Sequence, residues 1–474
     1  MRKLSRTISG VTPVAVMAQP MGCPGKCVYC PTYVATPQSY TPESPAVLRA
    51  ISCEYDAKKQ VKLRLRILAD MEHPTDKVEL IIMGGTFLAS PVEYQYALIK
   101  DCFDALNGTE SENLEEAQKI NEKARNRCVG LCIETRPDWC RQKDIERMLE
   151  FGVTRVELGV QILDDDIYKL VGREHHVEDV VNATRLLREY GFKVYYHWMP
   201  GLPGSSPQHD LKLSNMMFTD ARFKPDGIKL YPTMVVAGTE LEKWHREGRY
   251  KPYDDNVMVD LVADIKAGVP KYVRISRVLR DIPAKFITGG LKDSLRDIVK
   301  MKMKEQGINC RCIRCREYGH RIKNGWQVGE PSLKRLDYEA SDGREILLSF
   351  EDKKETIFGM LRLRIQDKSL PRFMYPPGKL ALVRELHVYG PEVAIGGNNI
   401  HAAQHKGLGR NMLAEAERIA SEEFSVPIIA VLSGVGARQY YRSDYMGYEL
   451  KESYMIKKLF NGISDSTLLD SNSA

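Results

Sequence analysis

Three cysteines stand within eight residues near the start of the chain, in the stretch MGCPGKCVYCPTY. Cys23, Cys27 and Cys30 have the spacing C-x3-C-x2-C, and the whole chain has only 11 cysteines in 474 residues. Disulfides need pairs of cysteines and a structural zinc ion usually has four ligands. Thiolates also hold iron–sulfur clusters, and a 4Fe–4S cluster on three thiolates keeps one iron open for a small molecule. A zinc site completed by a distant ligand is the alternative.

A second cysteine group is formed by Cys310, Cys312, Cys315 and His320, with the spacing C-x-C-x2-C-x4-H. Three thiolates and an imidazole suit a closed tetrahedral site, so we predict a structural zinc ion here. His320 is the nearest fourth ligand in the sequence, although another histidine or a carboxylate could take its place. Free thiols in a basic segment are the alternative. We expect the other cysteines to be ordinary core or surface thiols: Cys53, Cys102, Cys128, Cys132 and Cys140.

Short apolar runs alternate with helix-length segments from Val14 to about Leu279. The runs are rich in Val, Ile and Tyr, as buried parallel strands are. Repeated strand–helix units predict a parallel sheet, open or closed into a barrel, whose chemistry would lie at the carboxyl ends of the strands. The expected strands are 13–18, 78–85, 129–135, 155–162, 193–199, 227–233 and 272–278. The expected helices are 45–71, 91–106, 141–151, 177–190 and 255–268.

From about Leu333 the strand patterns follow one another without helices between them, which predicts a second, α+β domain. The glycine turn QHKGLGR (404–410) then leads into an amphipathic helix. Such a turn presents backbone N–H groups and a positive dipole to a phosphate. The expected elements on either side of it are strands 346–352, 357–365, 381–390 and 427–432, a helix at 435–442, and a last strand at 454–459.

The net charge of +6 comes from 69 Lys and Arg against 63 Asp and Glu, but its distribution is uneven. Residues 1–70 and 271–323 are rich in Lys and Arg, which predicts a nucleic-acid partner; a solvated surface is the alternative. No run of about 18 apolar residues exists, so we expect no transmembrane helix and no membrane partner. Pro13 interrupts the apolar run of the opening stretch. We therefore interpret that stretch as mature sequence of a cytoplasmic protein.

The cysteine loop and the expected strand ends together resemble the radical S-adenosylmethionine (SAM) enzymes. The resemblance implies a partial TIM-type (β/α) barrel, a 4Fe–4S cluster on the three cysteines of the loop, and SAM on the open iron. One electron would then cleave SAM to a 5′-deoxyadenosyl radical. The motifs that carry the resemblance are CPGKCVYC, MGGTF (83–87), IETRPD (133–138), ELGVQ (157–161) and HWMPGLPG (197–204). The SAM-binding residues that it implies are Gly84, Gly85, Glu134, Arg136, Gln161 and His197.

The second domain resembles the GNAT-type acetyltransferases, in which Q-x-x-G-x-G/A holds the pyrophosphate of acetyl-CoA. The strand before the turn would pair with the pantetheine arm and the acetyl carbonyl. Tyr440 or Tyr441 would protonate the departing thiolate, with core packing as the alternative. His387 and His401 are candidate bases, with a structural role as the alternative. The implied acetyl-CoA residues are Leu386, His387, Val388, Gln404, Lys406, Gly407, Leu408, Gly409, Arg410 and Tyr440.

Nearly the whole chain, from about Arg6 to Leu459, resembles the catalytic subunit of Elongator in its stand-alone microbial form. The resemblance implies carboxymethylation of carbon 5 of the wobble uridine of tRNA, with acetyl-CoA as carbon donor and SAM as radical source. The radical would take a hydrogen from the acetyl methyl group, the product would add to the uracil ring, and hydrolysis of the thioester would free CoA. The implied parts are a radical SAM domain (1–284), a connector with the zinc motif (285–330) and a GNAT domain (331–474).

Lys229 and Tyr231 of the segment GIKLYPT would line the cleft where the two substrates meet, holding the flipped base or the acetyl group. A structural pair lining the barrel is the alternative. The basic segments would bind the anticodon stem-loop through its phosphates. The sequence leaves the oligomeric state open, a homodimer included.

Three other functions remain open at this stage. One is a protein lysine acetyltransferase whose iron–sulfur domain is structural. Another is a non-catalytic tRNA-binding scaffold that senses acetyl-CoA. The third is a different radical enzyme that modifies tRNA, such as a methylthiolating one, but it gives the acetyltransferase-like domain no role.

Overall fold

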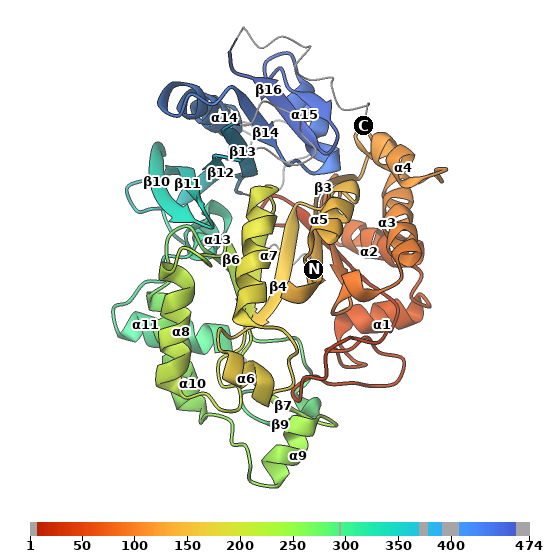
Figure 1. Ribbon diagram of the computed structural model, residues 1–474, viewed down its shortest axis with the longest axis vertical. Helices are drawn as coiled ribbons and strands as arrows, with labels where there is room; N and C mark the ends of the chain where they lie inside the picture. Colours follow the sequence, from red (N-terminus) through yellow and green to blue (C-terminus); the bar gives the residue numbers. More distant parts are fainter. Residues whose placement is uncertain (1–6, 293–294, 369–377, 391–406, 461–474) are drawn as a thin grey trace.

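Two seven-stranded sheets organise the chain (Figure 1). The computed structural model describes residues 7–292, 295–368, 378–390 and 407–460. In Figure 1 the C-terminal sheet, in cyan to blue, lies above the N-terminal sheet and its helices, in red to green. Within the described ranges, no helix combines the length and the apolar character that a membrane crossing needs.

The N-terminal sheet is parallel throughout, and its strand order follows the chain. β1 and β8 form its two edges and do not pair with each other, so the barrel is open. The predicted partial barrel is therefore confirmed, and each of the seven expected strands has a counterpart in it. The strands are β1 (Thr12–Met17), β2 (Lys77–Met83), β3 (Arg127–Thr135), β4 (Arg155–Gln161), β5 (Lys193–Trp198), β6 (Gly227–Leu230) and β8 (Arg274–Val278).

Helices connect these strands, and the expected single helix over 45–71 is wrong. The chain forms two helices there, because Glu54 and Tyr55 adopt left-handed φ angles of 54° and 59°. Asp56 then caps the second helix, its carboxylate accepting from the backbone N–H of Lys59 at 2.7 Å. The helices are α1 (Pro45–Ser52), α2 (Ala57–Asp70), α3 (Val92–Asn107), α4 (Leu114–Asn121), α5 (Gln142–Glu150), α6 (Asp165–Leu170), α7 (Val177–Glu189), α8 (Pro207–Thr219), α9 (Glu240–Arg246) and α10 (Asp255–Ala267).

The C-terminal sheet is mostly antiparallel, but β13 and β14 are parallel neighbours. They pair over Ala381–Val383 and Ile429–Val431, and within the described ranges Arg384–His387 have no strand partner on that edge. The expected strands are present, while β10 and β15 were not expected. The elements are β10 (Ser332–Ala340), β11 (Gly343–Glu351), β12 (Ile357–Gln366), β13 (Leu380–Val388), α14 (Leu408–Arg418), β14 (Ile428–Val431), α15 (Arg438–Arg442), β15 (Glu449–Lys451) and β16 (Tyr454–Lys458).

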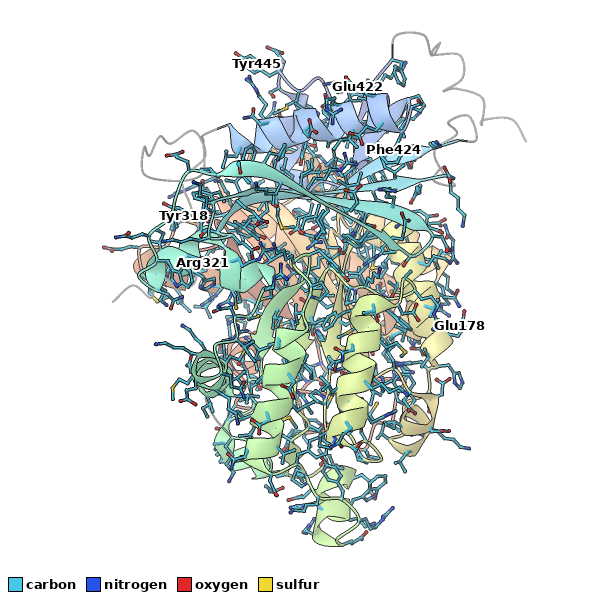
Figure 2. All side chains as sticks on the ribbon, turned by 90° about the vertical axis from the view of Figure 1, so that its left-hand side faces the viewer. Glu178, Tyr318, Arg321, Glu422, Phe424 and Tyr445 are labelled. Atoms are coloured by element: carbon cyan, nitrogen blue, oxygen red, sulfur yellow. The ribbon has the colours of Figure 1, made fainter. Side chains whose placement is uncertain are left out.

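The connector packs against both sheets. The backbone N–H of Ile313 donates to Val273 O at 2.9 Å beside β8, and the ring of Tyr318 lies 5.0 Å from that of Phe358 on β12. Figure 2 shows Tyr318 and Arg321 directly below the C-terminal sheet. Its elements are β9 (Ile287–Gly289), which pairs with β7 (Val235–Val236) of the N-terminal domain, and the helices α11 (Leu295–Glu305), α12 (Ile313–Arg316) and α13 (Tyr318–Lys323).

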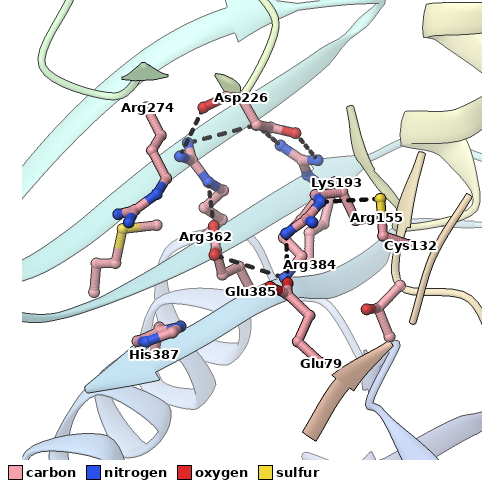
Figure 3. A network of polar contacts seen from close by, with 12 residues as sticks. Glu79, Cys132, Arg155, Lys193, Asp226, Arg274, Arg362, Arg384, Glu385 and His387 are labelled. Atoms are coloured by element: carbon pink, nitrogen blue, oxygen red, sulfur yellow. Dashed lines mark hydrogen bonds and ion pairs between the residues drawn. The ribbon is translucent and has the colours of Figure 1, made fainter. Parts of the chain in front are cut away.

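The two faces of the C-terminal sheet have different neighbours. Leu361 and Val383 pack with α14 in a core of their own, whereas Leu382 and Ile428 belong to the main core of the N-terminal domain. Buried ion pairs reinforce this second contact (Figure 3). Arg384 donates to both carboxylate oxygens of Asp226 at 2.7 and 2.8 Å, and all four side chains of the network are closed to water: Asp226, Glu345, Arg362 and Arg384. The two domains therefore share one interior.

Candidate active site

One cavity of about 600 Å³ reaches from the cysteine loop of the N-terminal domain to β13 of the C-terminal domain. Cys23, Cys27 and Cys30 line one part of it, and Glu385, His387 and Tyr389 line another. Between them lie residues from the carboxyl ends of β3, β4, β5 and β6, namely Glu134, Gln161, His197 and Lys229. Groups held at the cysteines and at β13 would therefore share a single cavity.

The cysteine loop follows β1 and is tied to neighbouring segments through its backbone. The N–H of Val28 donates to Val171 O at 3.0 Å, and Val28 O accepts from the N–H of Leu241 at 2.8 Å. The three cysteines are free and partly buried. Their sulfurs do not all lie within 4.8 Å of one another, in contrast to those of the second group. This separation fits a cluster, in which each thiolate binds a different iron, better than a single metal ion.

Cationic side chains surround the sulfurs. Arg173 is buried, with Nη1 3.6 Å from Cys27 Sγ and 3.3 Å from the hydroxyl of Tyr29. Burial and the neighbouring Cys27 raise the pKa of the Cys30 thiol to about 12, against the opposing effect of Arg280. A bound metal is then needed to hold Cys30 as a thiolate. The donor set therefore fits an iron–sulfur cluster.

Two polar atoms beside the loop are buried and have no partner within the described residues, Arg136 Nη1 and Gln161 Oε1. A Cβ on Gly25 would lie 2.2 Å from Arg136 Nη1, so the loop needs glycine there for the guanidinium to lie beneath it. Gln161 has a left-handed φ of 69°, a strained conformation that is typical of functional sites. An unpaired donor and an unpaired acceptor fit a polar ligand such as the amino-acid part of SAM.

The other residues predicted to bind SAM lie in the same region. Gly84 and Gly85 follow β2 with φ of 141° and 78°, values that favour glycine. Gly85 lines the cavity, whereas Gly84 does not, because a Cβ there would lie 3.0 Å from that of Ala18. Glu134 accepts from the hydroxyl of Tyr40 at 2.7 Å. The structure thus brings the predicted set together around the cysteine loop.

The centre of the cavity holds a charged group made of Glu134, Glu157, His197 and Lys229. His197 Nε2 lies 3.0 Å from Glu157 Oε2, and Lys229 pairs with both carboxylates. Burial alone would raise the pKa of Glu157, but Lys229 and His197 hold it well below its usual range. Burial would likewise lower the pKa of Lys229, but Glu157, Tyr231 and Glu134 raise it well above normal. Lys229 is therefore a fixed cation and not a base.

The acetyltransferase-like half offers a second group of candidate residues. Leu386 and Val388 point to the core around α14, whereas His387 points into the cavity, as alternation along a strand requires. α14 begins at Leu408, after Gly407 with a left-handed φ of 75°. A Cβ on Gly409 would lie 3.1 Å from the hydroxyl of Tyr440. Gln404, Lys406 and His401 lie outside the described residues.

The two candidate tyrosines have different environments. Tyr440 is 42% exposed and lies beside the N-terminus of α14. Tyr441 is buried in the core around α14, and burial raises its pKa. Tyr440 could therefore contact a ligand bound at the N-terminus of α14. Tyr441 instead packs in the core, which was the alternative to a catalytic role.

Comparisons with known proteins support the first half of this description. A family model for the radical SAM superfamily matches residues 20–215, and one for the radical SAM C-terminal domain matches residues 225–305. Members of this superfamily carry a 4Fe–4S cluster and SAM. The second match includes β6, β8 and α11, so the N-terminal domain and part of the connector both belong to radical SAM architecture.

Comparisons over the full length decide the family. A tRNA uridine(34) acetyltransferase of Dehalococcoides mccartyi (strain CBDB1) is 67% identical over 460 residues, covering 97% of this chain and 100% of the relative. The chain belongs to the tRNA uridine(34) acetyltransferase family. Elongator complex protein 3 of Homo sapiens is 42% identical over 96% of this chain and 85% of its own length. The solved structure of the archaeal Methanocaldococcus infernus Elp3 with an N-terminal deletion superimposes with a TM-score of 0.84, at 45% identity over 95% of this chain and 100% of that one.

In this member of the tRNA uridine(34) acetyltransferase family, the second cysteine group is compact. The sulfurs of Cys310, Cys312 and Cys315 all lie within 4.8 Å of one another, as thiolates sharing one metal ion must. The structure does not bring His320 into this group. Its Nε2 lies 3.0 Å from Glu317 Oε1, and Glu317 also pairs with Arg274 at 2.5 Å. Within the described residues, no other histidine, cysteine or carboxylate joins the three sulfurs.

Some residues that contact the candidate active site were not predicted from the sequence. Arg173 lies after α6, in a segment that matches no motif. The sequence therefore gave no indication that its side chain contacts Cys27. Glu157 belongs to the motif ELGVQ, but its place in the charged group of the cavity became visible only through its contact with Lys229. Ser9 O accepts from His387 Nε2 at 2.6 Å across 378 residues, a contact that no local pattern could indicate.

Proposed function

We propose that this protein modifies the wobble uridine, position 34, of tRNA by carboxymethylating carbon 5, with acetyl-CoA as carbon donor and SAM as radical source. The main support for this proposal is that one cavity is lined by both the cysteine loop and β13. A radical made at the loop must reach the acetyl group before it meets another reactant, and a path within one shared cavity favours this. The names of the relatives support the tRNA uridine as substrate.

The N-terminal residues would prepare the radical. Cys23, Cys27 and Cys30 hold the cluster, which when bound supplies the electron that cleaves SAM to a 5′-deoxyadenosyl radical. The unpaired Arg136 Nη1 and Gln161 Oε1 bind polar groups of SAM and fix its orientation. Substrate positioning of this kind accounts for a large part of the rate in enzymes that use cofactor chemistry.

The C-terminal residues would hold acetyl-CoA. The edge of β13 at Arg384–His387, which has no strand partner among the described residues, accepts the pantetheine arm, and the N-terminus of α14 at Leu408 binds the pyrophosphate. The arm then passes between β13 and β14 from the α14 side to the cavity. Tyr440, beside Gly409, contacts the bound CoA at the N-terminus of α14.

The middle of the cavity would receive the flipped uridine. Lys229 pairs with Glu134 and Glu157, and Arg155 lies 3.4 Å from Glu157, so two cations balance the two carboxylates without a metal ion. Tyr231 packs edge-on against His197, with ring centroids 5.3 Å apart, and offers the base an aromatic wall. Arginines that line the cavity would contact the tRNA backbone: Arg49, Arg64, Arg277, Arg280 and Arg314.

A zinc ion on Cys310, Cys312 and Cys315 would complete the proposal as a structural clip. The segment lies against β8 through the bond from Ile313 N–H to Val273 O, and Cys312 is buried. An ion there would fix the connector below the C-terminal sheet and so maintain the shape of the shared cavity.

The test uses the cluster-loaded protein under anaerobic conditions with reductant, SAM, tRNA and acetyl-CoA labelled in both acetyl carbons. We expect labelled carboxymethyluridine at position 34, measured by mass spectrometry of digested tRNA, and none when SAM is left out. Labelled acetyl-lysine on a peptide, formed without SAM and without labelled uridine, would show a protein acetyltransferase instead. Binding of tRNA and acetyl-CoA without either product would show a scaffold.

A further inference from the structure

His387 has one ring nitrogen fixed by the backbone of a distant segment. It lies near the end of β13, and its Nε2 is 2.6 Å from Ser9 O. A carbonyl oxygen only accepts hydrogen bonds, so Nε2 carries the proton. The ring is also held in place by stacking on Tyr389, with centroids 4.4 Å apart and planes 23° apart. Both the orientation and the tautomer of His387 are therefore set before any substrate binds.

The other ring nitrogen is left as an acceptor. Burial lowers the pKa of His387, with Arg274 and Lys193 acting in the same direction, while Glu385 and the bond to Ser9 oppose them. The imidazole is then neutral at ordinary pH, and Nδ1 has a lone pair. Within the described part of the chain, Nδ1 has no hydrogen-bond partner, and the side chain lines the shared cavity.

The place of His387 on the strand matches the place of the thioester in the proposed function. Among the described residues, Arg384–His387 of β13 have no strand partner on the edge that faces β14, and Leu386 and Val388 point the other way, into the core around α14. An acyl chain that follows this edge and enters the cavity would put its thioester beside residue 387. No other residue of β13 on this face offers an imidazole.

We propose that His387 is the general base that activates the water which hydrolyses the thioester after the new carbon–carbon bond has formed. This inference rests on the function proposed above. The water oxygen attacks the thioester carbonyl carbon while one of its protons passes to Nδ1. The carbon–sulfur bond then breaks, the sulfur keeps the electron pair, and the proton held on Nδ1 passes to it. One thioester and one water give one carboxylic acid and one thiol, so no oxidant or reductant is needed.

Neighbouring groups are worse candidates for this base. Glu385 points into the same cavity, but Arg362 donates to it at 2.9 Å and Lys193 lies 3.7 Å from it. Burial would raise the pKa of Glu385, but Lys193 and Arg362 lower it to about 2, so it holds a proton poorly. His197 faces Glu157 at the centre of the cavity and belongs to the SAM side.

The deciding variant is His387→Gln, because the glutamine amide can keep the hydrogen bond to Ser9 O while Nδ1 is lost. In single-turnover reactions with tRNA, SAM and labelled acetyl-CoA, we expect release of carboxymethyluridine to fall about 100-fold. The uridine–acetyl–CoA thioester should accumulate in its place, as detected by mass spectrometry. The wild-type rate of release should fall as pH drops through the pKa of His387, and the variant should lack this dependence.

The matched control is His245→Gln, since His245 Nδ1 also lies 3.0 Å from a backbone oxygen, that of Tyr250, but outside the cavity. It should release product as the wild type does. Release at the wild-type rate by His387→Gln, or loss of both adduct and product, would overturn the role of His387. If His387→Gln does not fold, His387→Phe takes its place with the same expectation, because the ring can keep its stacking on Tyr389 while both nitrogens are lost. If the wild type itself forms neither adduct nor product, the proposed function fails instead.

Discussion

The two cysteine groups have nearly the same spacing and very different geometry. Cys23, Cys27 and Cys30 are spread along an extended loop, and they line the shared cavity. The second group, Cys310, Cys312 and Cys315, starts α12 and draws its sulfurs within 4.8 Å of one another. The distance between sulfurs depends on the local backbone and not on the count of residues between them. It separates a site for several irons from a site for one ion.

Their surroundings differ in the same way. Arg173 Nη1 lies 3.6 Å from Cys27 Sγ, and buried polar atoms without partners lie close to the loop. Around the compact group, Cys312 is closed to water and the segment is bonded to β8. The first group therefore has room and partners for a ligand, whereas the surroundings of the second favour the structural role that we propose for it. The predictions below test this contrast.

The largest expected effect comes from Cys27→Ser. Loss of one of three thiolates should prevent stable cluster assembly, so iron and sulfide content should fall and 5′-deoxyadenosine formation should drop to background. The thermal midpoint should stay within about 2 °C of wild type, because Cys27 is only partly buried, its side chain lines the cavity, and serine differs from cysteine by a single atom. Elemental analysis, electron paramagnetic resonance and calorimetry measure these quantities. A normal cluster signal in this variant would show that the loop is not the cluster site.

The next effect comes from Cys312→Ser. It should remove the zinc ion and lower the thermal midpoint by roughly 5 °C or more, because the connector loses its clip. Cluster assembly should be retained. The expected loss of zinc and stability without loss of the cluster is the opposite of the result expected for Cys27→Ser. Zinc content by mass spectrometry and the same calorimetry test it. If both variants lost both metals, the two groups would not be independent sites.

Much of the fold could be predicted because its signal is local. The seven apolar runs became the seven strands of the open barrel, and the residues at their ends met around one cavity. The break at Glu54 and Tyr55 was missed, because a capping Asp56 inside a helical pattern looks like an ordinary surface residue. β10 was missed because most of its residues are exposed and the strand lacks a buried pattern.

The parts of the site that could not be predicted depend on contacts between distant segments. Arg173 meets Cys27 across 146 residues, and Ser9 meets His387 across 378. Only the packing of the C-terminal sheet on the barrel creates the second of these contacts. The turn at Gln404 to Lys406 stays a prediction from sequence, and so does its role in binding acetyl-CoA.

The smallest effect is expected from His320→Ala, which tests whether the compact cysteine group binds its metal ion through the three sulfurs without His320. His320 matches the zinc spacing, but its Nε2 lies 3.0 Å from Glu317, outside the three sulfurs. Glu317 keeps Arg274 at 2.5 Å and the hydroxyl of Ser9 at 2.9 Å when the imidazole is removed. We therefore expect full zinc content and a loss of stability of about 1 kcal/mol or less, measured beside Cys312→Ser. Zinc loss equal to that of Cys312→Ser would make His320 the fourth ligand, and the compact group would then need the side chain to turn away from Glu317.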